Sequence, residues 1–316
     1  MNFFSGKNIL ITGGNGYICS SVAKTLVNKA RRLTLFTRQT GDITDKAIWQ
    51  SVLKKVDIVY HFAAQTSSKL ANEQPMLDLE TNVLPVIRLI DTCVKYNYAP
   101  DIIFAGTVTE TGFAGKEKIN EDRKDLPITI YDIHKLTTEK YLQYYTNQLG
   151  KRSVVLRLPN IYGPGPASSK PDRGITNMMI RKALKGEALT IFGTGTYMRD
   201  YLYIDDVVDA FLKAAINIEK TKGNYYVLGT GVGHTILEMA TMIKIEVKKI
   251  SGKEIKILFA PFPEGTSQIE YRNFIADSSK FRKDKDWSAK ISLREGIKRT
   301  IKYFNTQTVI PAKAGI

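Results

Sequence analysis

The sequence contains few of the residues on which several classes of protein depend. Among its 316 residues only two are cysteines, Cys19 and Cys93, and only three are histidines, His61, His134 and His234. None of them forms a CxxC pair or has the spacing of a zinc site, so we expect two buried thiols and no metal. No apolar run approaches the roughly 18 residues that a membrane span requires, and the N-terminal stretch has no signal-peptide pattern. We therefore expect a cytoplasmic protein without disulfides or a membrane span.

Acidic residues are also scarce relative to basic ones. There are 31 Asp and Glu against 46 Lys and Arg, which gives a formal net charge of +15. Such a balance can indicate nucleic-acid binding. The lysines are spread from Lys7 to Lys313, however, and no basic block is interleaved with aromatic residues. We expect a solvated basic surface and no nucleic-acid partner, with attraction of a diphosphate-bearing metabolite as the next interpretation.

The sequence does contain a regular alternation of short apolar runs and longer segments with helical period. The runs are KNILIT, RLTLFT, VDIVYHFAA, DIIFAGT and SVVLRL, and the main helical segments are 17–30, 76–97 and 131–150. This alternation is typical of an α/β fold with a doubly wound parallel sheet of the Rossmann type. From Asn160 the chain becomes rich in Gly and Pro, and another helical stretch follows at 174–186. Here we place a smaller C-terminal substrate lobe.

These observations predict a division of the chain. A dinucleotide-binding Rossmann domain covers residues 1–165, with segments returning at about 200–245. The substrate-binding lobe covers 166–199 and 246–304. Residues 305–316, NTQTVIPAKAGI, show neither the helical nor the strand periodicity of apolar residues, so we expect a loose tail there.

Glycines gather in the stretch ITGGNGYICS, directly after the first apolar run. Gly13, Gly14 and Gly16 lie between a predicted strand and a predicted helix, which is the context of a phosphate-binding loop rather than of a simple turn. Small residues let the backbone approach a pyrophosphate, which then accepts from free N–H groups at the helix N-terminus. Cys19 stands where the last glycine of such a motif packs the helix on the strand. We expect Cys19 to affect packing and not binding.

A second motif is YDIHK, which heads a helical segment. Tyr131 and Lys135 are therefore one turn apart on one face. An ammonium near a phenol lowers the tyrosine pKa, which provides an acid/base for use near neutral pH. The spacing alone is common in helices. Together with the glycine loop and the strand-end residues Thr107 and Thr109 of FAGTVTETG, it predicts a proton-transfer site.

With these motifs in this order, the chain resembles the extended short-chain dehydrogenase/reductase family, of the NAD-dependent epimerase/dehydratase type. The similarity is greatest to nucleotide-sugar enzymes of the UDP-galactose 4-epimerase kind. It runs from about residue 6 to 303 and rests on TGGNGYI, GDITD, VYHFAAQ, NV at Asn82, YDIHK, LRLPNIYGPG, GTGTYMRDYLYIDDVVDAF, YVLGTG and ADSSK.

The resemblance implies roles for individual residues. Tyr131 would be the catalytic acid/base, Lys135 would bind the nicotinamide ribose, and Thr107 would hold the sugar oxygen. The implied cofactor-binding positions are Gly13, Gly16, Tyr17, Ile18, Thr37, Arg38, Asp42, Ile43, Ala63, Ala64, Asn82, Lys135 and Pro159. The implied substrate-binding positions are Thr107, Thr109, Asn160, Asn177, Arg199 and Arg272.

Among the substrate positions, Asn177 would face the nucleotide base and the two arginines the diphosphate, because a guanidinium binds phosphate oxygens in pairs. Structural alternatives stay open: Arg199 as an ion pair with Asp200, and Asn160 as the cap of a turn. The resemblance also implies a homodimer through the helices near 76–97 and 131–150.

The chain departs from the family at the end of the second predicted strand. NAD users in this fold carry an acidic residue there for the ribose hydroxyls. Counting from Gly13, that place falls on Thr37, followed by Arg38. A hydroxyl and a guanidinium suit a 2′-phosphate, so we expect NADP rather than NAD, with NAD left open.

A second departure is a deletion. In the family a helix and a third strand precede the Asp-Ile pair that contacts adenine, whereas here Asp42 and Ile43 follow Thr37 after only four residues. Adjacent strands end about 4.8 Å apart and five extended steps reach about 17 Å. We therefore expect the third strand and its crossover helix to be missing and the adenine side to be more open.

A third departure concerns the reaction. Dehydratases and decarboxylases of this family need an Asp-Glu or Ser-Glu pair directly after the catalytic threonine, where this chain has Val108 and Thr109 and no carboxylate. Elimination of water or carbon dioxide then lacks its acid/base group, and hydride transfer assisted by Tyr131 remains. We expect a UDP-sugar 4-epimerase acting through a 4-keto intermediate. An NADPH-dependent nucleotide 4-keto-sugar reductase stays open, as does a catalytically silent NADP-binding or scaffold subunit.

Overall fold

A computed structural model describes residues 2–115, 117–166 and 174–309, the last three as backbone only. Its largest element is a sheet of six strands, all parallel, in the order β2-β1-β3-β4-β5-β9. The strands are β1 (Asn8–Thr12), β2 (Arg32–Phe36), β3 (Ile58–His61), β4 (Asp101–Thr107), β5 (Ser153–Leu158) and β9 (Tyr225–Val227). The predicted Rossmann-type sheet is confirmed.

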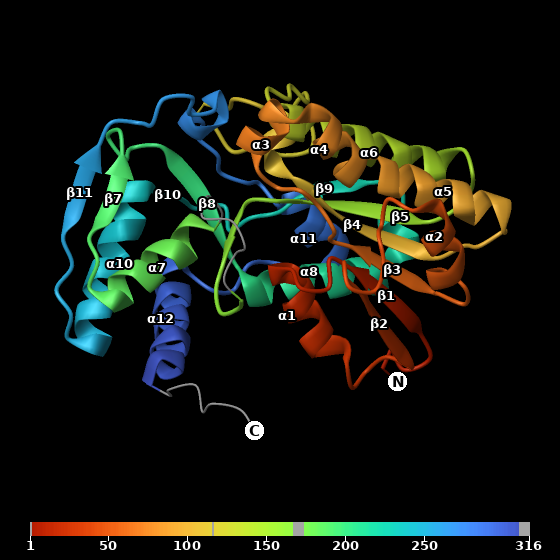
Figure 1. Cartoon of the computed structure of the whole chain (residues 1–316), viewed down its shortest axis with the longest axis horizontal. Helices are drawn as coiled ribbons and strands as arrows, with labels where there is room; N and C mark the ends of the chain where they lie inside the picture. Colours follow the sequence, from red (N-terminus) through yellow and green to blue (C-terminus); the bar gives the residue numbers. More distant parts are fainter. Residues whose placement is uncertain (1, 116, 167–173, 310–316) are drawn as a thin grey trace.

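Helices cover both faces of this sheet (Figure 1). One face carries α1 (Tyr17–Leu26) and α8 (Ile204–Ile216), which α9 (Ile218–Thr221) follows. The other carries α2 (Lys46–Val52), α3 (Ser68–Glu73), α4 (Pro75–Asn82), α5 (Leu84–Lys95) and α6 (Ile130–Asn147). Side chains alternate along a strand, so Ile11 lies in the core of the first face and Leu10 in that of the second. Burial on both faces explains why these strands read as continuous apolar runs.

The third strand of the family's sheet is absent from the described part of the chain, as the sequence predicted. In the described part of the chain β2 pairs only with β1, and its residues before the buried Phe36 are exposed or partly exposed, as at an edge. After β2 the chain turns through Asp42 and Ile43 into α2, and then enters β3 on the other side of β1. The Trp49 indole holds this turn by donating to the Ile43 carbonyl (3.0 Å). The deletion read from the sequence is confirmed.

A second lobe lies beside the carboxyl ends of the parallel strands (Figure 1, left). Its sheets are β6 (Asn160–Tyr162), β8 (Met198–Tyr203) and β10 (Gly233–Thr235), and the pair β7 (Leu189–Phe192) and β11 (Ile257–Ala260). Its helices are α7 (Ile175–Lys185), α10 (Ile236–Ser251) and α12 (Leu293–Val309). Three short elements, η1 (Val108–Thr111), η2 (Gln268–Tyr271) and α11 (Ser279–Lys285), complete the described structure.

Two predicted boundaries differ from the structure. Helix α10 packs on α7 and α12, so the segment that returns to the Rossmann domain ends before residue 236 and not near 245. The tail expected to be loose from Asn305 is wrong for residues 305–309, which continue α12. Ile297, Ile301 and Phe304 are buried on one side of that helix and anchor it. Residues 167–173 and 310–316 of the predicted lobe and tail lie outside the described residues.

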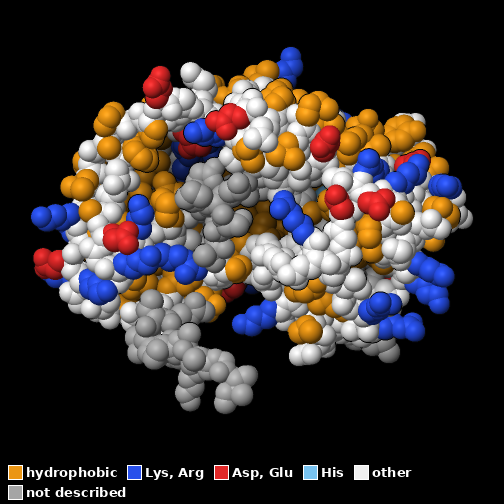
Figure 2. Space-filling model, in the orientation of Figure 1, with side chains coloured by type: hydrophobic (Ala, Val, Ile, Leu, Met, Phe, Trp, Pro, Cys, Tyr) orange, Lys and Arg blue, Asp and Glu red, His pale blue; other side chains and the backbone are white. Residues whose placement is uncertain are grey.

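The distribution of charged side chains on the surface can be compared with the one expected from the sequence. Lys and Arg side chains are interspersed with Asp and Glu over the face shown in Figure 2, without one basic band. Among the described helices, none has an apolar stretch long enough to cross a bilayer. Cys19 and Cys93 are both buried free thiols, as expected.

Candidate functional site

The glycine loop lies at the carboxyl ends of β1, β2 and β3. Gly13 has φ of +77°, and a Cβ there would lie 2.9 Å from the backbone nitrogen of Ala63. The N–H of Gly14 donates to the Phe36 carbonyl at the end of β2 (2.9 Å). Gly13 must be glycine, because a side chain there would overlap the backbone of the segment after β3. At Gly14 a Cβ would meet the methyl group of Thr37 at 2.5 Å. The loop is therefore held against the sheet edge by its own backbone.

Helix α1 begins directly after this loop. The first N–H groups of a helix have no acceptor within the helix, and the N-cap Gly16 has no side chain to accept from them. Tyr17 and Ile18 are its first residues, so their N–H groups are available to an anion. Cys19 is fully buried in the core between α1 and the sheet. That position agrees with the expected packing role.

The other predicted cofactor positions differ in how near they lie to this loop. Thr37 lies against Gly14 of the loop: if Gly14 had a Cβ, that atom would be 2.5 Å from the Thr37 methyl group. Arg38 follows and is exposed. Ala63 is held by the Thr12 hydroxyl, which accepts from its N–H (3.1 Å), and Ala64 follows it. Asp42 is an exposed turn residue whose carboxylate accepts from the N–H of Thr44 (2.8 Å), a contact that lowers the pKa of Asp42.

Asn82 acts on the loop that follows β3 rather than facing a cavity. Its amide accepts from the N–H of Gln65 (2.9 Å) and donates to the Gln65 carbonyl (3.0 Å). It also donates to Asp78, which pairs with His134 of α6 (2.7 Å). Asn82 therefore fixes the backbone path of the segment after Ala64.

Two of the predicted catalytic residues, Thr107 and Tyr131, line one cavity of about 260 Å³ between the two lobes. Predicted residues that line it are Thr107, Thr109, Tyr131, Pro159, Asn160 and Arg272. Polar residues that also line it, and that the sequence interpretation did not include, are Thr66, Ser68, Thr176, Asp132 and Glu270. Elements far apart in the chain thus supply one polar pocket.

Lys135 lies one helical turn after Tyr131 and is buried. Its ammonium sits over the Phe104 ring at 4.0 Å from the centroid. Burial lowers the pKa of Lys135, while the charges of Glu110 and Asp78 act in the opposite direction. The ammonium is thus a buried charge on the face of α6 that carries Tyr131.

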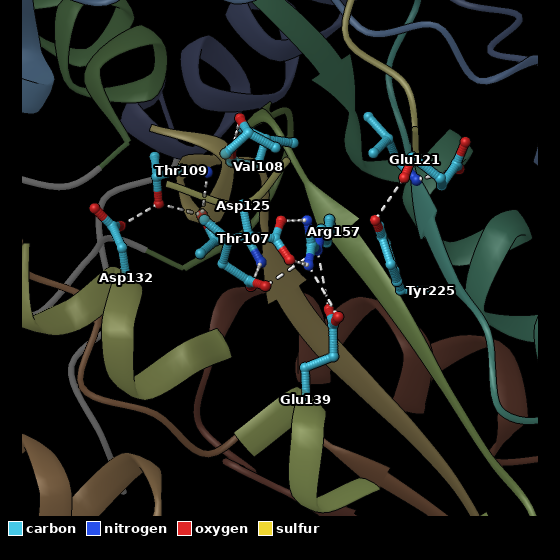
Figure 3. A network of polar contacts seen from close by, with 12 residues as sticks. Thr107, Val108, Thr109, Glu121, Asp125, Asp132, Glu139, Arg157 and Tyr225 are labelled. Atoms are coloured by element: carbon cyan, nitrogen blue, oxygen red, sulfur yellow. Dashed lines mark hydrogen bonds and ion pairs between the residues drawn. The ribbon is translucent and has the colours of Figure 1, made fainter. Parts of the chain in front are cut away.

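Thr107 is held from behind by a network of buried charges (Figure 3). Its N–H donates to the carboxylate of Glu110 (2.8 Å), which pairs with Arg157 of β5 (3.1 Å). Arg157 also binds Glu139 of α6 (2.9 Å) and Asp125 (2.5 Å). Burial raises the pKa of Glu110, and the Arg157 charge opposes this shift. The network joins β4, β5 and α6 behind the cavity.

Two predicted substrate residues do not line the cavity. The Arg199 guanidinium donates to the carbonyls of Met198, Glu270 and Arg272, and burial lowers the pKa of Arg199 to about 10. The alternative pair with Asp200 is not formed either, because that carboxylate accepts from backbone N–H groups such as that of Ala276 (3.2 Å). Arg199 instead fixes the segment that carries Arg272.

Asn177 is the other such residue. Its side chain accepts from the N–H of Gly163 (3.1 Å) and donates to the Gly163 carbonyl (2.9 Å). Arg272, by contrast, lines the cavity, and its buried Nε–H has no acceptor among the described residues. A ligand with phosphate or carboxylate oxygens would supply that acceptor.

Asp132 is the most informative residue that the sequence interpretation missed. Its carboxylate accepts from the hydroxyl of Thr109 and from the N–H of Thr129 (3.2 Å). Burial raises the pKa of Asp132. Its place directly after Tyr131 in YDIHK was visible, but only the fold shows that it reaches the strand-end threonines.

The geometry agrees with comparisons to known proteins. The chain matches the model of the NAD dependent epimerase/dehydratase family over residues 9–229. UDP-glucose 4-epimerase from Lactobacillus helveticus is 28% identical over 316 residues, covering 89% of this chain and 92% of that protein. The structure of Thermotoga maritima UDP-glucose 4-epimerase with UDP-glucose has a TM-score of 0.84 at 30% identity, covering 95% of this chain and 99% of that one. Thermus thermophilus UDP-glucose 4-epimerase in complex with NAD has a TM-score of 0.82 at 26% identity, covering 94% and 98%.

The family match spans well over half of the chain, so the chain belongs to the NAD-dependent epimerase/dehydratase family. The resemblance inferred from the motifs is thereby confirmed. The protein is an NAD-dependent enzyme of nucleotide sugars.

Proposed function

We propose that the protein is a UDP-hexose 4-epimerase that interconverts UDP-glucose and UDP-galactose through a 4-keto intermediate. The observation that carries this proposal is the meeting of Tyr131, Thr107 and Arg272 at one cavity. A proton acceptor, a group for the reacting oxygen and a diphosphate-binding cation are the parts such a reaction needs. The names of the relatives support the choice of a UDP-sugar.

The residues of the chain fit a bound dinucleotide. The glycine loop and the uncapped N-terminus of α1 provide a backbone cradle for the pyrophosphate, at Gly13, Gly16, Tyr17 and Ile18. Lys135 would hold the nicotinamide ribose, and Pro159 lies at the cavity wall. When bound, the nicotinamide supplies a reversible acceptor for hydride.

The chain's own residues carry out the proton chemistry. Tyr131 takes the proton of the 4-hydroxyl as the sugar is oxidised and returns it when the sugar is reduced on the other face. The buried ammonium of Lys135 favours the ionised form of the phenol. Thr107 holds the same sugar oxygen, and the Glu110–Arg157 network keeps Thr107 in place.

Arg272 would bind the diphosphate, with Asn160 beside it at the cavity wall. Arg199 contributes indirectly, because its hydrogen bonds to backbone carbonyls position Arg272. Asn177 would likewise shape the base-binding region through Gly163 rather than touch the base.

A product assay tests this function. The purified protein is incubated with UDP-glucose and, in parallel samples, NAD⁺ or NADP⁺, and UDP-galactose is measured by NMR. We expect product from the wild-type chain and a loss of about 10²-fold to 10⁴-fold in rate for Tyr131→Phe, because that change removes the proton acceptor. Full activity of Tyr131→Phe would exclude the mechanism, and a wild-type chain inactive on both UDP-hexoses would exclude the function.

We keep a second candidate, an NADPH-dependent reductase of nucleotide 4-keto sugars, because of Thr37 and Arg38. Neither side chain is acidic, and Arg38 is exposed beside the loop, where a 2′-phosphate would lie. The same residues favour NADP over NAD in either reaction. An epimerase returns the hydride to the sugar, so turnover of UDP-glucose without net consumption of dinucleotide supports the epimerase. Stoichiometric consumption of added NADPH with a 4-keto sugar supports the reductase.

We also propose a homodimer through α5 and α6, as the resemblance implied. Val94 of α5 and Ile133, Tyr141 and Tyr144 of α6 expose large apolar side chains on this side of the sheet. A face of this kind is more apolar than a monomer surface needs. Light scattering should give twice the chain mass, and Tyr144→Lys combined with Val94→Lys should give the monomer; a wild-type monomer contradicts the proposal.

A further inference from the structure

The side chain of Tyr17, the first residue of α1, extends from the glycine loop to the segment that follows β6. A Cβ on Gly165 would lie 2.6 Å from Cδ2 of the Tyr17 ring, and a Cβ on Gly163 would lie 3.2 Å from the Tyr17 hydroxyl oxygen. Gly163 and Gly165 have φ of +138° and +155°, which residues with a side chain rarely adopt. The Tyr17 side chain therefore lies directly against the backbone of two glycines.

Helix α7 of the second lobe binds the backbone of the same two glycines (Figure 1). The Asn177 side chain accepts from the N–H of Gly163 (3.1 Å) and donates to its carbonyl (2.9 Å). Arg181, one turn further along α7, donates to the Gly165 carbonyl (3.0 Å). The start of α1 and the helix α7 thus meet at one short piece of backbone.

Each end of this connection lies at one of the two proposed binding regions. The backbone N–H of Tyr17 is among the free N–H groups at the start of α1, from which a pyrophosphate would accept. Ile175 and Thr176, in the first turn of α7, line the cavity proposed for the UDP-sugar. Tyr17 is not one of the described residues that line this cavity. Its side chain can act on a UDP-sugar only through the two glycines and α7.

We propose that Tyr17 is a positioning residue that couples dinucleotide binding at the start of α1 to UDP-sugar binding beside α7. The inference rests on the proposed function, because that function places these two ligands in these two regions. It gives the Tyr17 side chain a role separate from that of its backbone N–H.

The coupling has an entropic origin. A pyrophosphate that accepts from the Tyr17 N–H restrains the backbone of that residue, and so restrains the ring that projects from it. The ring in turn restrains Gly163 and Gly165, which have more conformational freedom to lose than other residues. A UDP-sugar that binds afterwards meets an ordered segment and an ordered α7, so it loses less conformational entropy. Linkage requires the same gain when the two ligands bind in the opposite order.

The ring of Tyr17 provides the packing contact with Gly165, and its hydroxyl lies near Gly163. Burial raises the pKa of Tyr17, and the Asn177 side chain opposes this shift, so the phenol is uncharged at neutral pH. Coupling by packing needs the ring and not a charge. Tyr17→Phe keeps the ring and should keep the coupling, whereas Tyr17→Ala removes it.

The test measures affinity for UDP by calorimetry, with and without a saturating concentration of ADP-ribose, or of its 2′-phosphate if that binds more tightly. UDP lacks the hexose and ADP-ribose lacks the nicotinamide, so direct contact between the two reacting groups cannot produce the coupling. We expect the wild-type chain to bind UDP about tenfold more tightly when ADP-ribose is bound, within the usual range of coupling between sites. The affinity for ADP-ribose should rise by the same factor when UDP is bound.

In Tyr17→Ala the ratio of the two UDP affinities should fall to about one, and in Tyr17→Phe it should stay near the wild-type value. Arg181→Met tests the other end, because it removes the hydrogen bond to the Gly165 carbonyl, and it should also lower the ratio. It replaces the test if circular dichroism shows that Tyr17→Ala does not fold. Tyr98→Ala is the control: Tyr98 is partly buried against the core on the other face of the sheet, and the ratio should not change.

The outcomes separate this inference from the proposed function. A ratio of one or less in the wild-type chain, or an unchanged ratio in folded Tyr17→Ala, overturns the inference; the proposed function then stands if UDP-glucose is epimerised. An equal loss in Tyr98→Ala also overturns the inference, because the effect would follow from any loss of packing. If the wild-type chain does not bind UDP at all, the inference and the proposed function are both overturned.

Discussion

The two halves of the site are built by different means. The half proposed to bind the cofactor consists mainly of backbone: a glycine loop, the start of α1 and the ends of three strands within the first 64 residues. The half proposed to bind the sugar consists of side chains from β4, α6, β6 and the segment after η2. Among them, Thr107 is held by the carboxylate of Glu110, and Arg272 is held through its carbonyl by Arg199. The first half depends on space near the backbone, and the second on charge and hydrogen-bond direction. Substitutions should therefore affect the two halves through different physical causes.

The largest effect is expected in the backbone half. Gly16→Val should abolish dinucleotide binding, because a Cβ at Gly16 already lies 2.9 Å from the Gly13 carbonyl oxygen. Cys19→Gly is the matched control at the other end of the motif and should leave affinity nearly unchanged, at a stability cost of about 1 kcal/mol or more from glycine in a helix. Calorimetric titration with NAD⁺ measures both. Equal losses of affinity would mean that the loop is misassigned.

The next effect tests the side-chain half. Arg157→Met should lower the free energy of unfolding by about 3–5 kcal/mol, because it leaves buried carboxylates such as Glu110 and Glu139 without their cation. Arg299→Met is the control: Arg299 also pairs with a carboxylate, that of Glu295 (2.8 Å), but the two side chains are 46% and 43% exposed. That change should cost far less, because solvent screens an exposed ion pair. Urea denaturation measures the free energy of unfolding of both variants. Similar losses would show that the buried network contributes no more to stability than an exposed ion pair.

A smaller, pH-dependent effect returns to the backbone half. The Thr12 hydroxyl accepts from the N–H groups of Phe62 and Ala63, so it donates to Nδ1 of His61, which must be neutral. Burial lowers the pKa of His61 to about 3 from its ordinary 6.5. The unfolded chain therefore binds a proton that the folded chain does not, and stability present above pH 6.5 is lost as the pH falls toward 3.

Between pH 7.5 and 5.5 this loss should be about 1.4 kcal/mol. His61→Asn keeps an acceptor for Thr12 but does not titrate. Between pH 7.5 and 5.5 its free energy of unfolding should therefore fall by about 1.4 kcal/mol less than that of the wild-type chain. Urea midpoints at the two pH values provide the measurement. Parallel pH profiles for the two proteins would rule out His61 as the cause.

The smallest effect concerns the exposed rim of the cofactor half. Arg38→Ala should reduce affinity for NADP⁺ by about tenfold, the range of one exposed charge-assisted contact, and leave NAD⁺ unaffected. Arg31→Ala, another exposed arginine beside β2, is the control and should change neither. A wild-type chain that binds NAD⁺ more tightly than NADP⁺, with no change in Arg38→Ala, would refute the predicted preference.

The contrast between the two halves also explains which parts of the fold and of the candidate site could be predicted from the sequence. The doubly wound parallel sheet, the missing third strand and the position of the glycine loop follow from local motifs and from a count of residues between them, so the sequence was sufficient for these features. Arg199 and Asn177 stand at family positions, but the carbonyls that they bind belong to Glu270 and Gly163, distant in sequence. Asp132 was overlooked because its partner Thr109 is on another element. The last turn of α12 was missed because hydrogen bonding continues a helix that its earlier turns have already anchored.

The open edge at β2 has a kinetic consequence. With no third strand, fewer groups surround the adenosine end of a bound dinucleotide, while the pyrophosphate cradle is intact. Contacts of this kind act mostly on the dissociation rate rather than on the association rate. We expect the dinucleotide to leave this protein sooner than it leaves relatives with a complete sheet. The fraction of enzyme that carries its cofactor would then follow the free dinucleotide concentration around it.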